Sequence, residues 1–331
     1  MSQNERSLSE SLTLQQRPKL TVGRSLRNMR QYGLIMGLLL LGVVLSILSP
    51  VFPTPANLLD IVLQSSVNGA IALGMTFVIA TGGIDLSVGS IWALTGITIG
   101  LLVKSGIPWP VAVLLGLGAG VVCGAFTGLL VTRGKVPPFI ATLGTMSVYR
   151  GLALIISNGY TVYGFPRGFQ FIGSGKLLMI PMPVIILAAA FLLARFLFSR
   201  CAFGRYVVAI GGNKEAARLC GINVNRYVLQ AYVVGALLAA VGAIIATSRL
   251  DAAEPIAGSG AELDAIAAVV MGGTSLSGGE GNIAGTLVGA LVIGTVRNGL
   301  TLMNVPTFYQ IATIGLIIIA AVLADRAGNA R

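Results

Sequence analysis

Apolar stretches of about 20 residues recur along the whole of this 331-residue chain and limit its possible folds more than any other feature. A helix of that length crosses the roughly 30 Å hydrocarbon core of a bilayer. Only 10% of the residues are charged, whereas soluble domains contain about 25%. The composition therefore does not fit a soluble protein. The ten stretches cover residues 31–49, 60–80, 86–103, 109–131, 138–157, 180–198, 227–248, 262–273, 283–300 and 306–324.

These stretches predict an all-α, polytopic integral membrane protein with about 10 transmembrane helices, within a range of eight to ten. The stretch 262–273 is too short to cross a bilayer alone. Residues 252–261 before it contain Pro255, Gly258 and Gly260. Such a segment predicts a broken or re-entrant helix, which membranes tolerate only where protein or a water-filled cavity satisfies the backbone.

The basic residues predict how the chain lies in the membrane. Sixteen of the 22 Lys and Arg residues lie before the first stretch, in 132–137, in 195–226 or after the last stretch. The positive-inside rule therefore places both termini and the loop 199–226 in the cytoplasm. This topology explains most of the net charge of +11, so we expect membrane lipid and not nucleic acid as a partner. Residues 1–29 are expected to be a disordered cytoplasmic tail, and 326–331 a second cytoplasmic tail.

Residue types needed for several kinds of chemistry are missing. The chain has no His, which excludes catalysis, metal binding and proton relays by that side chain. Its three cysteines, Cys123, Cys201 and Cys220, have no paired spacing. Leu276–Glu280 reads Leu-Ser-Gly-Gly-Glu, like the signature motif of ATPase cassettes, but no phosphate-binding G-x-x-x-x-G-K-[ST] occurs. We therefore expect no enzyme active site, no metal and no cofactor.

Acidic and polar residues inside the apolar stretches are candidates for a solute pathway, because a carboxylate in hydrocarbon must pair, protonate or face water. The alternative for the acids is capping of a helix N-terminus. The alternative for the polar side chains is bonding between helices, worth about 0.6 kcal/mol each. The candidates for translocation or gating are Asn68, Thr76, Asp85, Ser87, Glu262 and Asp264. The wider polar set adds Gln64, Asn158, Arg297, Asn298 and Gln310.

Glycine patterns suggest close helix packing and a weak internal repeat. Gly116, Gly120, Gly124 and Gly128 line one stripe of a helix, and Gly281, Gly285 and Gly289 repeat the spacing. Both stripes fit either a contact between subunits or packing inside one subunit. The runs 82–89 and 272–279 match at five of eight positions, which suggests two related halves with a Gly-Gly break in each.

The long basic loop 199–226 contains a short predicted helix that Asn213 can cap and Gly221 can end. It would present a rigid projection to a partner, or it is a solvated loop. The residues of interest are Asn213, Lys214, Glu215, Ala216, Ala217, Arg218 and Gly221.

Four stretches in order resemble a known family: 74–89, 136–146, 210–224 and 262–276. The chain is similar there to the membrane permease subunits of ribose-type, binding-protein-dependent ABC sugar importers. The resemblance implies the ABC importer permease fold over residues 30–325. It also implies three partners: cytoplasmic ABC ATPase subunits, a periplasmic sugar-binding protein, and a second permease subunit in a homodimer or a paired permease.

In such importers a short cytoplasmic helix docks on the ATPase, and Glu215-Ala216-Ala217 looks like the start of that coupling pattern, although its Ile-x-Leu-Pro continuation is missing. The resemblance implies import of a pentose, a hexose or a related polyol by alternating access, driven by the ATPase subunits. The alternative is an ion-coupled secondary transporter of a small polar solute, with Asp85, Glu262 or Asp264 as coupling acids.

Overall fold

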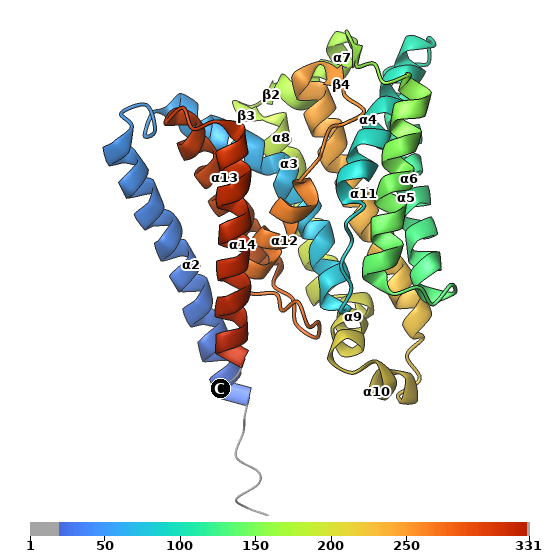
Figure 1. The fold of residues 1–331 in the computed structure, drawn as a ribbon, viewed down its shortest axis with the longest axis vertical. Coiled ribbons are helices and arrows are strands. Elements are labelled where there is room, and N and C mark those ends of the chain that lie inside the picture. Colours follow the sequence, from blue (N-terminus) through green and yellow to red (C-terminus); the bar gives the residue numbers. More distant parts are fainter. Residues whose placement is uncertain (1–19, 330–331) are drawn as a thin grey trace, which may run out of the picture.

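The computed structural model describes residues 20–329 as an elongated bundle of helices (Figure 1). Short strands pair in two antiparallel ribbons, β1 (Val162–Tyr163) with β4 (Ala252–Ala253), and β2 (Lys176–Leu177) with β3 (Ile180–Pro181). The helices are α2 (Leu20–Leu48), α3 (Pro55–Ala80), α4 (Val88–Lys104), α5 (Trp109–Thr132), α6 (Pro138–Ser157), α7 (Arg167–Ser174), α8 (Met182–Ser199), α9 (Ala202–Gly212), α10 (Lys214–Leu219), α11 (Val224–Leu250), α12 (Ala261–Met271), α13 (Ile283–Leu302) and α14 (Thr307–Asn329).

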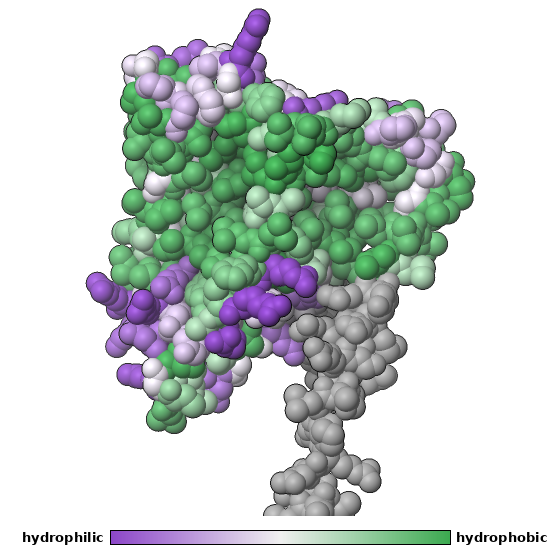
Figure 2. All heavy atoms as spheres, turned by 180° about the vertical axis from the view of Figure 1, so that it is seen from behind, coloured by the Kyte–Doolittle hydropathy of each residue, from purple (hydrophilic) through white to green (hydrophobic). Residues whose placement is uncertain are grey.

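Each of the ten predicted stretches contains one long helix or, at 262–273, one short helix, which confirms the polytopic all-α fold. Six helices in the described part of the chain are long and apolar enough to cross a membrane, and three shorter apolar helices accompany them. Figure 2 shows a broad hydrophobic belt on one side of the molecule, between more hydrophilic zones at its two ends. This is the surface expected of a protein surrounded by lipid.

The structure differs from the sequence prediction at both ends of the chain and in the loops. Helix α2 already begins at Leu20, so residues 20–29 are helical rather than disordered, and α14 continues to Asn329 through the predicted tail. The rest of the two predicted tails lies outside the described residues. Helices α7 and α9 were not predicted. Helix α9 is 11 residues long and lies inside the basic loop.

The two ends of the bundle differ in the short helices that they carry. Helices α9 and α10 lie at one end, with the start of α2 and the end of α14, while α7 and β4 lie at the other (Figure 1). We call these the α10 end and the α7 end. Helices α3 and α11 form the centre, where residues 69–80 of α3 are all buried.

The glycine stripes serve packing within this chain. A side chain at Gly120 or Gly124 would collide with Ala240 or Ala236 of α11, and a side chain at Gly289 would collide with the backbone of Ala268. The close approach that glycine allows therefore joins α5 to α11 and α13 to α12.

Residues 252–271 cross the bundle as an extended segment followed by a half-length helix. The segment begins at the α7 end, where Ala253 pairs with Val162. Helix α12 has 11 residues, or about 16 Å, which is half of what a membrane requires. The following loop reaches the α10 end, where the Gly279 amide donates to the carbonyl of Ala80 over 3.1 Å. The segment therefore crosses rather than re-enters.

Candidate coupling and translocation sites

Helix α10 is a short, exposed projection at the α10 end of the molecule (Figure 1). Asn213 caps it, since its side-chain oxygen accepts from the Ala216 amide over 2.9 Å. Gly221 follows with φ +80°, which ends the helix in a left-handed turn. Both features agree with the sequence prediction.

One face of α10 anchors it to the protein and the other is free. Ala217 is buried against Ile210 of α9 and Val224 and Val228 of α11. The other six residues of interest are exposed: Asn213, Lys214, Glu215, Ala216, Arg218 and Gly221. A helix held on one side in this way can pass a push on to the helix that precedes it.

Two Gly-Gly turns begin the loops that meet beside the end of α9. Gly82 follows α3 with φ +81°, and Gly273 follows α12 with φ +87°. In each, the residue after that glycine donates to a carbonyl five residues earlier, Gly83 to Val78 and Thr274 to Val269. The two turns are therefore alike, but they correspond at an offset of 191 and not at the 190 of the sequence match.

The end of α9 lies directly against both of the loops that these turns begin. A side chain at Gly211 would collide with the Ala80 carbonyl and the Gly279 amide, which bond to each other. A side chain at Gly278 would lie 2.7 Å from the Gly82 amide. The three segments meet backbone to backbone at this point, so a displacement of α10 and α9 would act directly on the end of α3 and on the loop that follows α12.

The first turns of α4 and α12 meet midway along the bundle. A side chain at Gly89 would collide with the Gly258 carbonyl and the Glu262 carboxylate. Glu262 accepts from the Gly260 amide over 3.2 Å. Arg150 of α6 donates to the carbonyls of Pro255 (3.0 Å) and Ala257 (2.6 Å). These contacts satisfy the non-helical backbone before α12.

Asp85 and Ser87 lie in the non-helical segment before α4, and both are fully buried. One carboxylate oxygen of Asp85 accepts from the Ser87 amide over 2.8 Å and from its hydroxyl over 2.6 Å. Ser87 is the N-cap residue of α4, although its side chain caps no amide. The second Asp85 oxygen and the Tyr232 hydroxyl have no hydrogen-bond partner within the described chain. Asp85 thus fixes the turn before α4.

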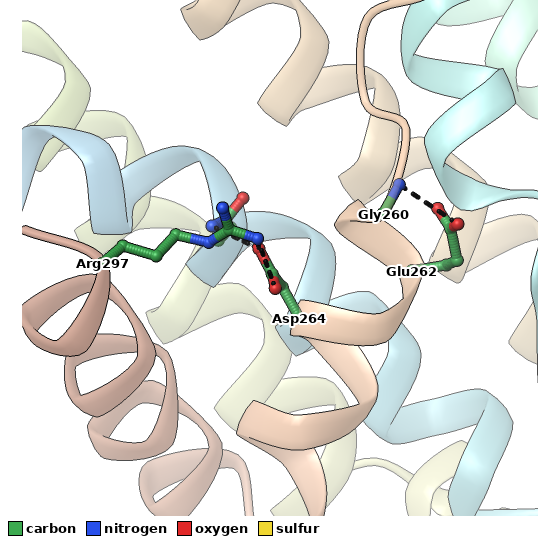
Figure 3. A network of polar contacts seen from close by, with 5 residues as sticks. Gly260, Glu262, Asp264 and Arg297 are labelled. Atoms are coloured by element: carbon green, nitrogen blue, oxygen red, sulfur yellow. Dashed lines mark hydrogen bonds and ion pairs between the residues drawn. The ribbon is translucent and has the colours of Figure 1, made fainter. Parts of the chain in front are cut away.

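Asp264 and Glu262 point in opposite directions from the first turn of α12 (Figure 3). Asp264 reaches α13, where Arg297 donates to its two oxygens over 2.9 and 2.8 Å. Asn68 of α3 lies 3.5 Å from the same carboxylate. Capping is one of the two interpretations of these acids, but Asp264 forms an ion pair instead. The sequence did not predict this pair, because Arg297 is 33 positions away.

Three other polar side chains form hydrogen bonds within the bundle, whereas Gln64 and Asn158 are exposed. Thr76 is buried and its hydroxyl lies 2.9 Å from that of Thr286. Asn298 exchanges two hydrogen bonds with Asn57, of 3.0 and 2.7 Å. Gln310 donates to the Val305 carbonyl over 2.9 Å. Thr76 and Asn298 thus join α3 to α13, whereas Gln310 bonds the loop that precedes its own helix.

Most of this chain matches one known protein family. The profile of a family described as "Branched-chain amino acid transport system / permease component" matches residues 57–322. The chain belongs to this permease family. The match includes α3 to α13, with α10, both Gly-Gly turns and the Asp264–Arg297 pair.

Characterised relatives of the permease extend over nearly its whole length. It is 49% identical over 304 residues to the ribose import permease protein of Bacillus subtilis, covering 91% of this chain and 94% of that protein. It is 47% identical to the ribose import permease protein of Escherichia coli, with 90% and 94% covered. The D-allose transport system permease protein of Escherichia coli is 41% identical, with 89% and 91% covered. No solved structure matches the permease.

Proposed function

We propose that this permease imports a sugar, a pentose, a hexose or a related polyol, by alternating access driven by separate ATPase subunits. The observation that carries this proposal is the 49% identity to a ribose import permease over nine-tenths of the chain. Other relatives carry the names of D-allose, L-arabinose and xylose permeases. Although the family description names branched-chain amino acids, these relatives favour the sugar branch.

The proposed orientation places the α10 end in the cytoplasm. The basic residues of 132–137 and 195–226 lie in segments that form this end, as the positive-inside rule requires. Both termini are then cytoplasmic, and the protein is a multi-pass component of the inner membrane. The α7 end faces the periplasm, where a sugar-binding protein docks. A second permease subunit completes the pathway, either as a homodimer or as a paired permease.

The proposed coupling begins at the exposed face of α10, where the cytoplasmic ATPase docks. A push on Lys214, Glu215 and Arg218 moves α9 with α10, because Ala217 fixes the two together. Gly211 then displaces the Ala80–Gly279 contact and with it the inner ends of α3 and α12. Such a bistable junction is what alternating access requires. The chain itself contributes no phosphate-binding loop, so nucleotide hydrolysis belongs to the partner.

The candidate pathway residues divide into two roles under this proposal. Asp85, Ser87 and Thr76 position the segments that move, because each is buried with its partners inside the bundle. Asn68, Glu262 and Asp264 lie where the broken segments meet, and these are the proposed gating residues.

Uptake of labelled ribose by proteoliposomes tests the proposal. We expect uptake only when the permease, the ATPase subunits, the binding protein and ATP are all present. Uptake by the permease alone under an ion gradient would support the ion-coupled alternative and overturn the importer.

A triple variant, Lys214→Ser with Glu215→Ser and Arg218→Ser, tests the docking surface. It should lower ATPase binding about tenfold or more, because docking energy concentrates in few residues. Arg200→Ser, an exposed basic residue outside α10, is the matched control and should leave binding unchanged.

A further inference from the structure

A stripe of polar side chains runs down one face of α3 from the α7 end. Asp60, Gln64 and Asn68 recur every four residues and therefore lie one above another on this helix. Their exposure decreases with depth, since Asp60 and Gln64 are exposed and Asn68 is half-buried. The stripe is thus open at the α7 end and becomes enclosed midway along the bundle.

An ion pair marks each end of this stripe. At the rim, Asp60 lies 3.5 Å from Arg249, and its side chain is 55% exposed. At the deep end, Asn68 meets Asp264, which is bound to Arg297. The Arg297 side chain is 30% exposed, although its Nε atom is buried without a hydrogen-bond partner among the described residues. Figure 3 shows Arg297 reaching across from its own helix to the first turn of α12.

Hydrocarbon is an unsuitable environment for this surface. A guanidinium or a free carboxamide in contact with lipid at this depth costs several kcal/mol. The stripe therefore faces water.

The charges on the stripe indicate which solute it suits. Both acids are paired with an Arg, so the stripe is formally neutral and holds no free carboxylate for a cation or an ammonium group. What remains are amide donors and acceptors on Gln64 and Asn68 and the guanidinium N–H groups of Arg297. These groups match a solute with many hydroxyl groups and no net charge.

We propose that Gln64, Asn68 and Arg297 form a sugar-binding station on the outer half of the pathway, with Asp264 holding Arg297 in position. This station rests on the proposed import function and names its contact residues. It accepts sugar released at the α7 end. It lies on the α7 side of α12, and a movement of α12 would close it. Because each contact is a single hydrogen bond, binding is weak enough for release.

Cysteine accessibility tests whether the stripe faces water. In a chain with Cys123, Cys201 and Cys220 changed to Ala, Gln64→Cys is labelled from outside with a charged, membrane-impermeant thiol reagent. Leu192→Cys is the matched control, since Leu192 is 63% exposed and lies at a similar distance from the outer end of its own helix. We expect rapid labelling at 64, protection by millimolar ribose in the assembled complex, and no labelling at 192. Equal rates at the two positions, or no protection, would overturn the station.

Uptake by the complete complex separates this inference from the proposed function. Gln64→Leu should raise the KM for ribose uptake about five- to tenfold with little change in kcat, as expected for the loss of one hydrogen bond to the solute. Gln64→Asn should recover part of that loss. If the unsubstituted complex imports no sugar, the proposed function fails, whereas sugar import that is insensitive to Gln64→Leu refutes only the station.

Discussion

The ion pair between Asp264 and Arg297 should make the two partners unequally costly to lose. Arg297→Gln leaves a carboxylate whose side chain is 5% exposed, with only Asn68 at 3.5 Å as a neighbour. An uncompensated buried charge of this kind costs about 3–5 kcal/mol. Asp264→Asn instead leaves a guanidinium that is 30% exposed and keeps contact with water. The Asp264→Asn change should therefore destabilise the fold by about 1–3 kcal/mol.

Thermal unfolding of the purified permease in one detergent measures this difference. At about 2 °C per kcal/mol for a chain of this size, Arg297→Gln should lower Tm by about 6–10 °C and Asp264→Asn by about 2–6 °C. The double variant should be more stable than Arg297→Gln alone, because two amides can bond to each other without a buried charge. The coupling energy of the pair is the loss in the double variant minus the sum of the losses in the two single variants.

The Asp60–Arg249 pair is the matched control for this experiment. It is longer, at 3.5 Å, and its acid is 55% exposed, so Asp60→Asn should cost less than about 1 kcal/mol. Two results would refute the reasoning: equal losses for Asp60→Asn and Arg297→Gln, or a double variant as unstable as the sum of its single changes.

Three further changes test the coupling end and the buried polar groups. Gly211→Val should impair the contact between Ala80 and Gly279, so that ATPase activity persists while sugar uptake falls at least tenfold; parallel loss of both activities would argue against a coupling role. Asn213→Ala removes the cap of α10 and should cost about 1 kcal/mol locally, seen as faster amide exchange in α10, with an unchanged exchange rate contradicting the cap. Tyr232→Phe removes a buried hydroxyl without a partner in the described chain and should leave Tm unchanged or raise it slightly, whereas a lower Tm would show that the hydroxyl is bonded.

Local signals in the sequence predicted the helices and the break before α12. The prediction for 138–157 matches α6 at both ends, because Pro137 and Pro138 fix its start and Asn158, at φ 51°, ends it. Pro255, Gly258 and Gly260 predicted the non-helical segment for the same reason. Each of these signals acts through the backbone of the residue itself, so it can be read without knowing the fold.

Contacts between distant segments could not be predicted in this way. The choice of Arg297 as the partner of Asp264 depends on which faces of α12 and α13 meet, and no local pattern encodes that. Likewise, Gln64 and Asn298 look alike in sequence, yet one lies on an open face and the other bonds Asn57 in a buried pair. The one-residue shift between the Gly-Gly runs also required the hydrogen bonds of the turns.

The meeting point of α4 and α12 has a mechanical consequence. Gly89 and Gly258 bring the first turn of α4 against the segment before α12 in direct backbone contact. Such a contact can serve as a pivot, because it lets the two helices tilt relative to each other without separating. A small stroke delivered near Gly211 would thereby open one mouth of the protein as it shuts the other, with no need to rebuild the core between them.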